Sequence, residues 1–266
     1  MNPVARATDQ LRRGAAAAGV LAVAAACGGS PEATTPSSSA PSSSAPSSGA
    51  LPQGGDAVDL DPADFTVDIT NPWWPMAVGD RWVYEESDGE GGVAKVEVTV
   101  LDRTKTVAAG VKGRVVHDIV TEDGEVIEDT LDYYAQDADG NIWYLGEKTA
   151  EYENGKVKTT EGSWEAGVDG GQAGIAVPAD PRAGTGYRQE YLADHAEDDG
   201  FVLSTDEQVQ TPTGLYEGAL MTRDTTPLEP KLVELKYYAP GVGPVMEVPV
   251  SGESGRTVLV ETTRTG

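Results

Sequence analysis

The sequence is poor in the residues that build disulfides, metal sites and nucleophilic centres. It has one cysteine, Cys27, and two histidines among 266 residues. A single thiol forms no disulfide within the chain, so the folded part must be stabilised by its own core. Two histidines are too few for a multi-histidine transition-metal site. The sequence also lacks a nucleophile elbow, a phosphate-binding P-loop, a His-Glu-x-x-His zinc motif and a dinucleotide fingerprint, so none of the corresponding enzyme classes is indicated.

Basic residues are scarce as well, since 19 Lys and Arg stand against 44 Asp and Glu. Residues 1–27 hold three of the arginines and one aspartate, so the remaining chain has a net charge of about −27. Such an acidic surface argues against nucleic acid as a partner and against adsorption to anionic lipid by charge. It is compatible with cationic partners, with metal ions or with solubility outside the cell.

Long apolar runs are absent except near the N-terminus. Residues 14–26 form an uncharged run of 13 residues that follows Arg6, Arg12 and Arg13. A membrane-spanning helix needs about 20 residues, so this run is too short to cross a bilayer. Its length and its positively charged flank are typical of a signal peptide. We therefore predict that residues 1–26 direct export, and we expect no other segment to span the membrane.

The apolar run ends in Ala24, Ala25 and Ala26, directly before Cys27. This pattern resembles the bacterial lipoprotein lipobox, in which the cysteine is diacylated before cleavage makes it the first residue, although Ala24 stands where leucine is favoured. The resemblance implies that acyl chains such as palmitate on Cys27 hold the protein at the outer face of the cell membrane. An ordinary small-residue cleavage site before a free cysteine would have the same sequence.

Residues 27–57 are rich in Ser, Pro, Ala and Gly, and the pentapeptide Ser-Ser-Ser-Ala-Pro occurs at 37–41 and again at 42–46. Such a composition cannot bury enough apolar surface to offset the loss of chain entropy on folding. Prolines extend the segment while Gly and Ser loosen it. We predict a disordered tether that holds the following domain away from the membrane.

Residues 58–266 show the period-two alternation of strands with one buried face. In residues 93–100, for example, valines at 96, 98 and 100 alternate with polar side chains. Similar patterns predict strands at 114–121, 126–136, 141–147, 187–192, 196–209, 216–223, 232–239, 245–250 and 256–263.

Turn residues separate these predicted strands. The pairs Asp123-Gly124 and Asn154-Gly155 favour tight hairpins, because both residues of each pair accept a positive φ. No segment has an amphipathic helical pattern. We therefore predict one all-β domain, an antiparallel meander that forms a barrel, half-barrel or sandwich. The glycine-rich interval 162–186 is expected to be an ordered crossover or a loop over one mouth.

Several segments resemble, in the same order, a family of actinobacterial cell-surface lipoproteins. They are residues 71–84, 132–147, 162–169, 187–191 with 196–198, and 228–230 with 236–243. The resemblance covers most of residues 65–250 and implies an exported, membrane-anchored domain, without catalytic residues to carry over. In architecture alone, a β-meander behind a tether is also similar to lipoproteins that carry lipids in a curved half-barrel.

Residues 137–147 carry oxygen ligands at alternating positions, as calcium loops do at their start. The candidate ligands are Asp137, Asp139, Asn141 and Glu147. In the helix-loop-helix calcium motif glycine is sixth and glutamate twelfth. Counted from Asp137, however, glycine is fourth and Glu147 eleventh. A plain hairpin turn explains the same residues, so a calcium site is one of two interpretations.

Two further segments gather side chains suited to binding or acid–base chemistry. In residues 163–169 an aromatic ring stands beside two carboxylates, and residues 190–198 hold the densest group of titratable side chains. The candidate ligand-binding residues are Trp164, Glu165, Asp169, Glu190, His195 and Glu197. A fixed surface loop and a solvated strand are the alternatives, because strand neighbours such as Glu197 and Asp198 point to opposite faces.

The sequence therefore predicts a non-enzymatic, lipid-anchored binding or scaffold domain that holds a small ligand or a surface protein. One alternative is an exported hydrolase that uses carboxylates among Glu165, Asp169, Glu190 and Glu197. The other is a calcium-stabilised surface module. A deep apolar cavity would favour ligand carriage, whereas carboxylates that converge within about 5–9 Å in a cleft would favour glycosidase-like hydrolysis.

Overall fold

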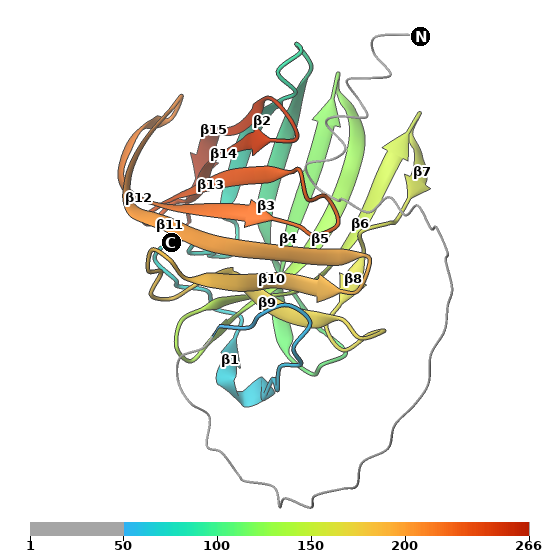
Figure 1. The fold of residues 1–266 in the computed structure, drawn as a ribbon. Coiled ribbons are helices and arrows are strands. Elements are labelled where there is room, and N and C mark those ends of the chain that lie inside the picture. The colour runs from blue at the N-terminus through green and yellow to red at the C-terminus, as the bar shows by residue number, and fades with distance from the viewer. Residues whose placement is uncertain (1–50, 266) are drawn as a thin grey trace, which may run out of the picture.

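The alternating segments form strands throughout residues 51–265, the part of the chain that the computed structural model describes (Figure 1). A short 3-10 helix, η1, spans Pro62–Asp64. The strands are β1 (Phe65–Thr66), β2 (Arg81–Ser87), β3 (Val93–Thr106), β4 (Lys112–Glu122), β5 (Glu125–Asp137), β6 (Ile142–Glu153), β7 (Lys156–Thr159), β8 (Trp164–Glu165), β9 (Gln172–Val177), β10 (Gly186–Leu192), β11 (Ala196–Thr211), β12 (Gly214–Thr225), β13 (Val233–Ala239), β14 (Gly243–Ser251) and β15 (Arg256–Thr263). Within this range no helix has the length and apolar character needed to cross a membrane.

The strands pair antiparallel, and most of them pair with a neighbour in sequence, as in a meander. Two pairings between distant segments close the sheet. Strand β2 pairs with β15, where Arg81 is opposite Thr263, and β6 pairs with β9, where Tyr144 is opposite Gly174. Together with the pairing of β5 and β6, they join β2–β6 and β9–β15 into a closed ring of twelve strands. The all-β prediction is confirmed, and the form adopted is the barrel.

The outer edge of β6 is divided among three partners. Residues 142–144 pair with β9, residues 146–147 pair with β8, and residues 151–153 pair with β7. Beyond residue 144, therefore, β6 leaves β9 and the ring has no continuous ladder there. In Figure 1 the far ends of β4–β7 extend away from β10 and β11.

The hairpins that the turn pairs predict are present. Asp123 and Gly124 connect β4 to β5, and Asn154 and Gly155 connect β6 to β7. All four residues have positive φ, between 50° and 83°. This backbone twist matches the twist of the flanking strands, which is why these two residue types suit two-residue hairpins.

The interval 162–186 differs from its expected form, because it contains β8 and β9, and β9 is part of the barrel wall. Its residues Ala173, Ile175 and Val177 are fully buried. At Gly174, a Cβ atom would lie 2.4 Å from the carbonyl oxygen of Gln189 on β10. The close approach of the two strands thus requires small residues, and small residues hide the alternation by which strands are recognised.

The N-terminal end of the described chain lies against β10. Arg188 donates hydrogen bonds of 2.6 Å to the carbonyl oxygens of Gly54 and Asp56, and its amide donates to the Pro52 carbonyl over 2.7 Å. Residues 51–57, which the composition groups with the tether, are therefore packed on the barrel. Cys27, the signal peptide and the tether up to residue 50 lie outside the described residues.

Candidate functional site

Side chains do not fill the barrel, and a cavity of about 390 Å³ remains inside it. Pockets for small molecules typically have about 300–1,000 Å³. Aromatic rings form part of the lining: Trp74 packs edge-to-face on Tyr134 with ring centres 5.3 Å apart, and Tyr134 stacks on Tyr144 at 5.0 Å. The cavity is therefore large enough for a small organic molecule and partly aromatic.

The lining is strongly acidic. Twelve of the described residues that line the cavity are Asp or Glu. One group, here called the acidic wall, comes from β2, β4, β5 and β6 and consists of Glu86, Asp118, Glu128, Asp132 and Glu147. A second group, the lysine wall, comes from β10–β14 and consists of Glu190, Asp198, Asp224, Glu234, Lys236 and Glu247. The two walls belong to opposite halves of the strand ring.

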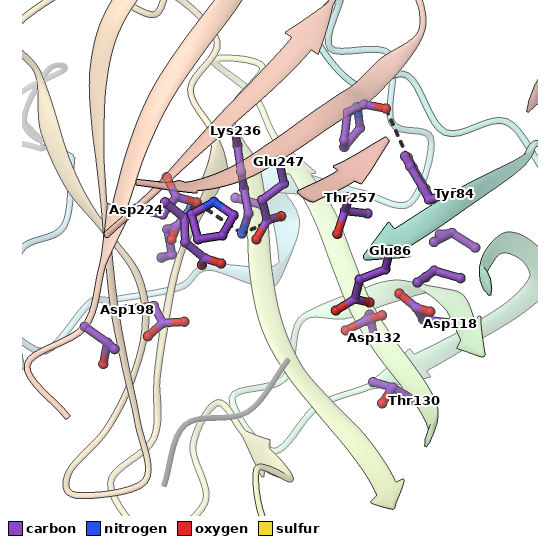
Figure 2. A pocket seen from close by; sticks show the side chains of 18 of the residues that line it. Tyr84, Glu86, Asp118, Thr130, Asp132, Asp198, Asp224, Lys236, Glu247 and Thr257 are labelled. Atoms are coloured by element: carbon purple, nitrogen blue, oxygen red, sulfur yellow. Dashed lines mark hydrogen bonds and ion pairs between the residues drawn. The ribbon is translucent and has the colours of Figure 1, made fainter. Parts of the chain in front are cut away.

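The lysine wall contains its own positive charge. The Lys236 ammonium lies 3.2 Å from an oxygen of Asp224 and 3.6 Å from an oxygen of Glu247 (Figure 2). Thr222 donates a hydrogen bond of 2.9 Å to the other oxygen of Asp224. Burial acts to lower the pKa of Lys236, but Glu247 and Asp224 outweigh it and raise this pKa well above its usual value. Lys236 therefore stays charged and fixed between two carboxylates.

The acidic wall has no such counter-charge. Within residues 51–265, none of its five carboxylates forms a salt bridge. Tyr144 donates a hydrogen bond of 2.8 Å to Asp132, and Thr130 donates one of 3.2 Å to Glu128. The Oδ1 atom of Asp118 is buried and has no hydrogen-bond partner. Figure 2 shows Glu86, Asp118 and Asp132 gathered close together with Thr130 nearby.

Burial raises the pKa of carboxyl groups on both walls. Burial and then the nearby Glu247 and Glu128 raise the pKa of Glu86 to about 8. The pKa of Asp132 rises to about 7, mainly through burial, although the hydrogen bond from Tyr144 acts to lower it. On the lysine wall, burial raises the pKa of Glu234 to about 9. Several carboxyl groups of the cavity are therefore at least partly protonated near neutral pH.

The structure brings together some of the predicted ligand-binding residues. Glu190 lines the cavity, and Trp164 donates a hydrogen bond of 2.6 Å to its carboxylate. Glu190 also lies opposite Asp198 in the β10–β11 pair, and burial followed by Asp198 raises its pKa well above the usual value. His195 is exposed at the edge of the cavity.

The other predicted residues lie elsewhere. Glu165 accepts a hydrogen bond of 2.7 Å from the Ala108 amide and forms a salt bridge of 3.1 Å with Lys105, so it fixes a loop. Asp169 is exposed in a turn, with φ of 50°. Glu197 accepts a hydrogen bond of 2.7 Å from the Asp194 amide and does not line the cavity, in contrast to its neighbour Asp198.

The four residues proposed as calcium ligands do not surround a common point. Asp137 accepts hydrogen bonds from the backbone and side chain of Asn141, both 2.8 Å, and one of 2.7 Å from the Trp143 ring. These contacts fix the hairpin turn between β5 and β6, where Asp139 is exposed. Glu147, in contrast, belongs to the acidic wall. Among residues 51–265, no three carboxylate, histidine or cysteine side chains are arranged to hold a metal ion.

Most of the cavity carboxylates were not among the predicted site residues. They can be recognised in the sequence as charged residues on the same face of a strand as its buried residues. Glu86 follows Trp82 and Tyr84 on β2, and Asp118 stands between Val116 and Val120 on β4. A charged side chain on the core-facing side of a strand indicates either a buried ion pair or a polar cavity.

Comparisons with known proteins gave likenesses of fold. No family model and no curated protein matches the chain. A candidate lipoprotein from Parabacteroides distasonis matches with a TM-score of 0.41 and 14% identity, over 73% of this chain and 99% of its own. A candidate exported protein with a YmcC-like fold from Bacteroides fragilis matches with a TM-score of 0.44 and 14% identity, over 73% and 100% of the two chains. A β-barrel-like domain of unknown function from Brucella abortus matches with a TM-score of 0.35 and 13% identity, over 70% and 98%.

Proposed function

We propose that this chain is an exported lipoprotein, anchored through Cys27 at the outer face of the cell membrane, whose barrel binds a small molecule without converting it. The positive N-terminal region, short apolar run and tether-like composition support export and anchoring. The observation that carries the binding function is the cavity of about 390 Å³, which remains open inside a closed ring of strands. The interior of a well-packed barrel contains few voids larger than a water molecule.

The lining favours a polar ligand over a lipid. Acyl chains bind best where they remove apolar surface from water. Here both halves of the ring present carboxylates, and an acyl chain bound against them would remove these groups from water without offering them any hydrogen bond. The cavity therefore suits a molecule that carries its own donors.

Native mass spectrometry of the full chain tests the binding function. The chain, purified in detergent from the membranes of its native host, should carry a non-covalent small-molecule adduct. Thr257 points toward the cavity in Figure 2, so Thr257→Trp should fill it and remove the adduct. Val250→Trp, at an exposed position, is the matched control and should keep it. An unliganded wild-type chain, or an adduct that survives Thr257→Trp, would contradict binding in the cavity.

The anchor is tested by Cys27→Ala. This variant should be released from membranes or should not be processed, because no acyl chain can be attached. Membrane retention of a normally processed variant would refute the anchor.

An exported carboxylate-dependent hydrolase is the second candidate, supported by one pair of residues. Glu190 and Asp198 lie opposite each other at the cavity, and burial raises the pKa of both carboxyls, that of Asp198 to about 6. Paired carboxyls with raised pKa values can act as general acid and base near neutral pH. If the adduct is chemically altered over time, and Glu190→Gln stops the change while the ligand stays bound, this second function holds.

A further inference from the structure

The two walls of the cavity differ in charge balance. On the lysine wall, Lys236 offsets Asp224 and Glu247 at 3.2 and 3.6 Å. On the acidic wall, the residues that could offset the carboxylates are hydroxyl donors alone, namely Tyr144 and Thr130. Arg256 and His195 also line the cavity, but both are exposed at its edge. The carboxyl groups that have no neighbouring cation are therefore concentrated on one side of the cavity.

A specific atom on this wall lacks a donor. Asp118 Oδ1 is buried without a hydrogen-bond partner, and a buried carboxylate oxygen in this state costs free energy. Burial, and then Asp132, Glu128 and Glu86, raise the pKa of Asp118 well above its usual value. These carboxyls from β2, β4 and β5 thus share one side of the cavity, where a positively charged donor would interact favourably with them.

The remaining lining selects the kind of cation. Val96, Val98 and Val116 line the cavity beside the carboxylates, and so do Tyr84 and Tyr134. Methylene groups pack well on such surfaces, and an ammonium group is attracted by aromatic faces. A bare metal ion, in contrast, needs several oxygen ligands at one point, and no such arrangement exists within residues 51–265.

From this geometry we infer that the ligand is a small organic cation with two or more ammonium groups separated by methylene groups, and that one ammonium binds between Glu86, Asp118 and Asp132. This inference rests on the proposed binding function and gives its ligand class. Ammonium groups supply the donors that the acidic wall lacks. The second ammonium is placed toward Glu190 and Asp198, which carry no salt bridge within the described chain. The cavity volume of about 390 Å³ suits a free molecule of this size.

Calorimetric titration of the full chain in detergent at pH 8.5 tests the ligand class, with spermidine as the probe. Spermidine should bind, and Glu86→Gln and Asp118→Asn should each weaken its binding by about tenfold or more, since each removes a charged acceptor. Glu85→Gln is the matched control, because Glu85 is exposed beside Glu86 and should leave binding unchanged. Both exchanges to amides remove a buried charge without changing shape, so the variants should fold, and circular dichroism checks this.

Three further probes separate the possible outcomes. Neutral 1,8-octanediol has a similar chain without charge and should bind at least tenfold more weakly than spermidine. If octanediol or the neutral dye Nile red binds the cavity and spermidine does not, the cation class is wrong while the binding function stands. If magnesium chloride reproduces the heat of spermidine, the effect is charge screening and the inference is overturned. Equal loss of binding in Glu85→Gln and Glu86→Gln would overturn it as well.

Discussion

Glu85 and Glu86 are neighbours on β2, yet they lie on opposite sides of the barrel wall. Glu85 is exposed to solvent, whereas Glu86 lines the cavity, and burial raises the pKa of Glu86 to about 8. One residue of β2 is therefore in contact with solvent, and the next one lies in the cavity and is mostly protonated at neutral pH. This pair gives an internal reference for the electrostatics of the cavity.

We predict that the barrel is more stable at pH 5 than at pH 9. The pKa values of Asp132, Glu86 and Glu234 are raised to about 7, 8 and 9 in the folded state, above the unfolded values. Groups with raised pKa contribute stability that is complete below the unfolded pKa and is lost as the pH rises through the folded pKa. Each group removes up to about 1.4 kcal/mol per pH unit in that window. Urea unfolding at several pH values measures the slope.

The control for this prediction is again the pair on β2. Glu86→Gln cannot ionise and should reduce the slope between pH 5 and 9, whereas Glu85→Gln should leave it unchanged. A slope of opposite sign, or one that Glu86→Gln does not alter, would show that the cavity carboxyls are ionised in the free protein.

A second prediction concerns Lys236. Lys236→Met leaves Asp224 and Glu247 near each other without their cation, so the free energy of unfolding should fall by about 3–5 kcal/mol. Adding Asp224→Asn and Glu247→Gln should restore a large part of the loss, because the uncompensated charges are then gone. Urea unfolding at pH 7.5 measures both variants. If the triple variant is no more stable than Lys236→Met, the loss comes from packing and the ion pairs contribute little.

Trp164 and Glu190 should be energetically coupled. The indole donates a hydrogen bond of 2.6 Å to the buried carboxylate, so Trp164→Phe should cost about 1–3 kcal/mol. In a double-mutant cycle with Glu190→Gln, a coupling of at least about 0.5 kcal/mol is expected. Additive losses in the cycle would mean that Trp164 contributes through packing on Tyr144 instead.

Arg188 should hold the N-terminal segment on the barrel. Arg188→Met removes the hydrogen bonds to the carbonyls of Gly54 and Asp56, so amide hydrogen exchange of residues 52–58 should accelerate about tenfold or more. Exchange in β3 should not change. Arg182→Met, which removes only an exposed ion pair with Asp180, serves as the control. Unchanged exchange of residues 52–58 in Arg188→Met would mean that other contacts fix the segment.

The fold could be predicted to a large extent because its determinants are local. Alternation identifies a strand over five or six residues, and Asp123 with Gly124 specifies a hairpin without reference to the rest of the chain. The strand β9 was missed because its contact with β10 selects small residues such as Gly174, and this contact is visible only in three dimensions.

The site was less predictable because it is assembled from distant parts of the chain. Glu86 on β2 and Glu247 on β14 are far apart in the sequence, yet Glu247 contributes to the raised pKa of Glu86. Tyr84 likewise donates a hydrogen bond to the carbonyl oxygen of Pro244, 160 positions away. The expectation that Glu197 and Asp198 face opposite sides agrees with their positions, but alternation alone does not tell which side contains a cavity. Dense clusters in sequence, as at residues 137–141, proved to be turns.

The pairing of β2 with β15 also bears on how the protein is made. Residue 81 on β2 pairs with residue 263 on β15, so one edge of β2 stays unpaired during synthesis until β15 has been made. Open edges are templates for wrong pairing, and contacts between such distant segments form slowly. In a chain that emerges N-terminus first, the cavity comes into existence only when β15 arrives. The closed barrel can therefore bind a ligand only after β15 has paired with β2.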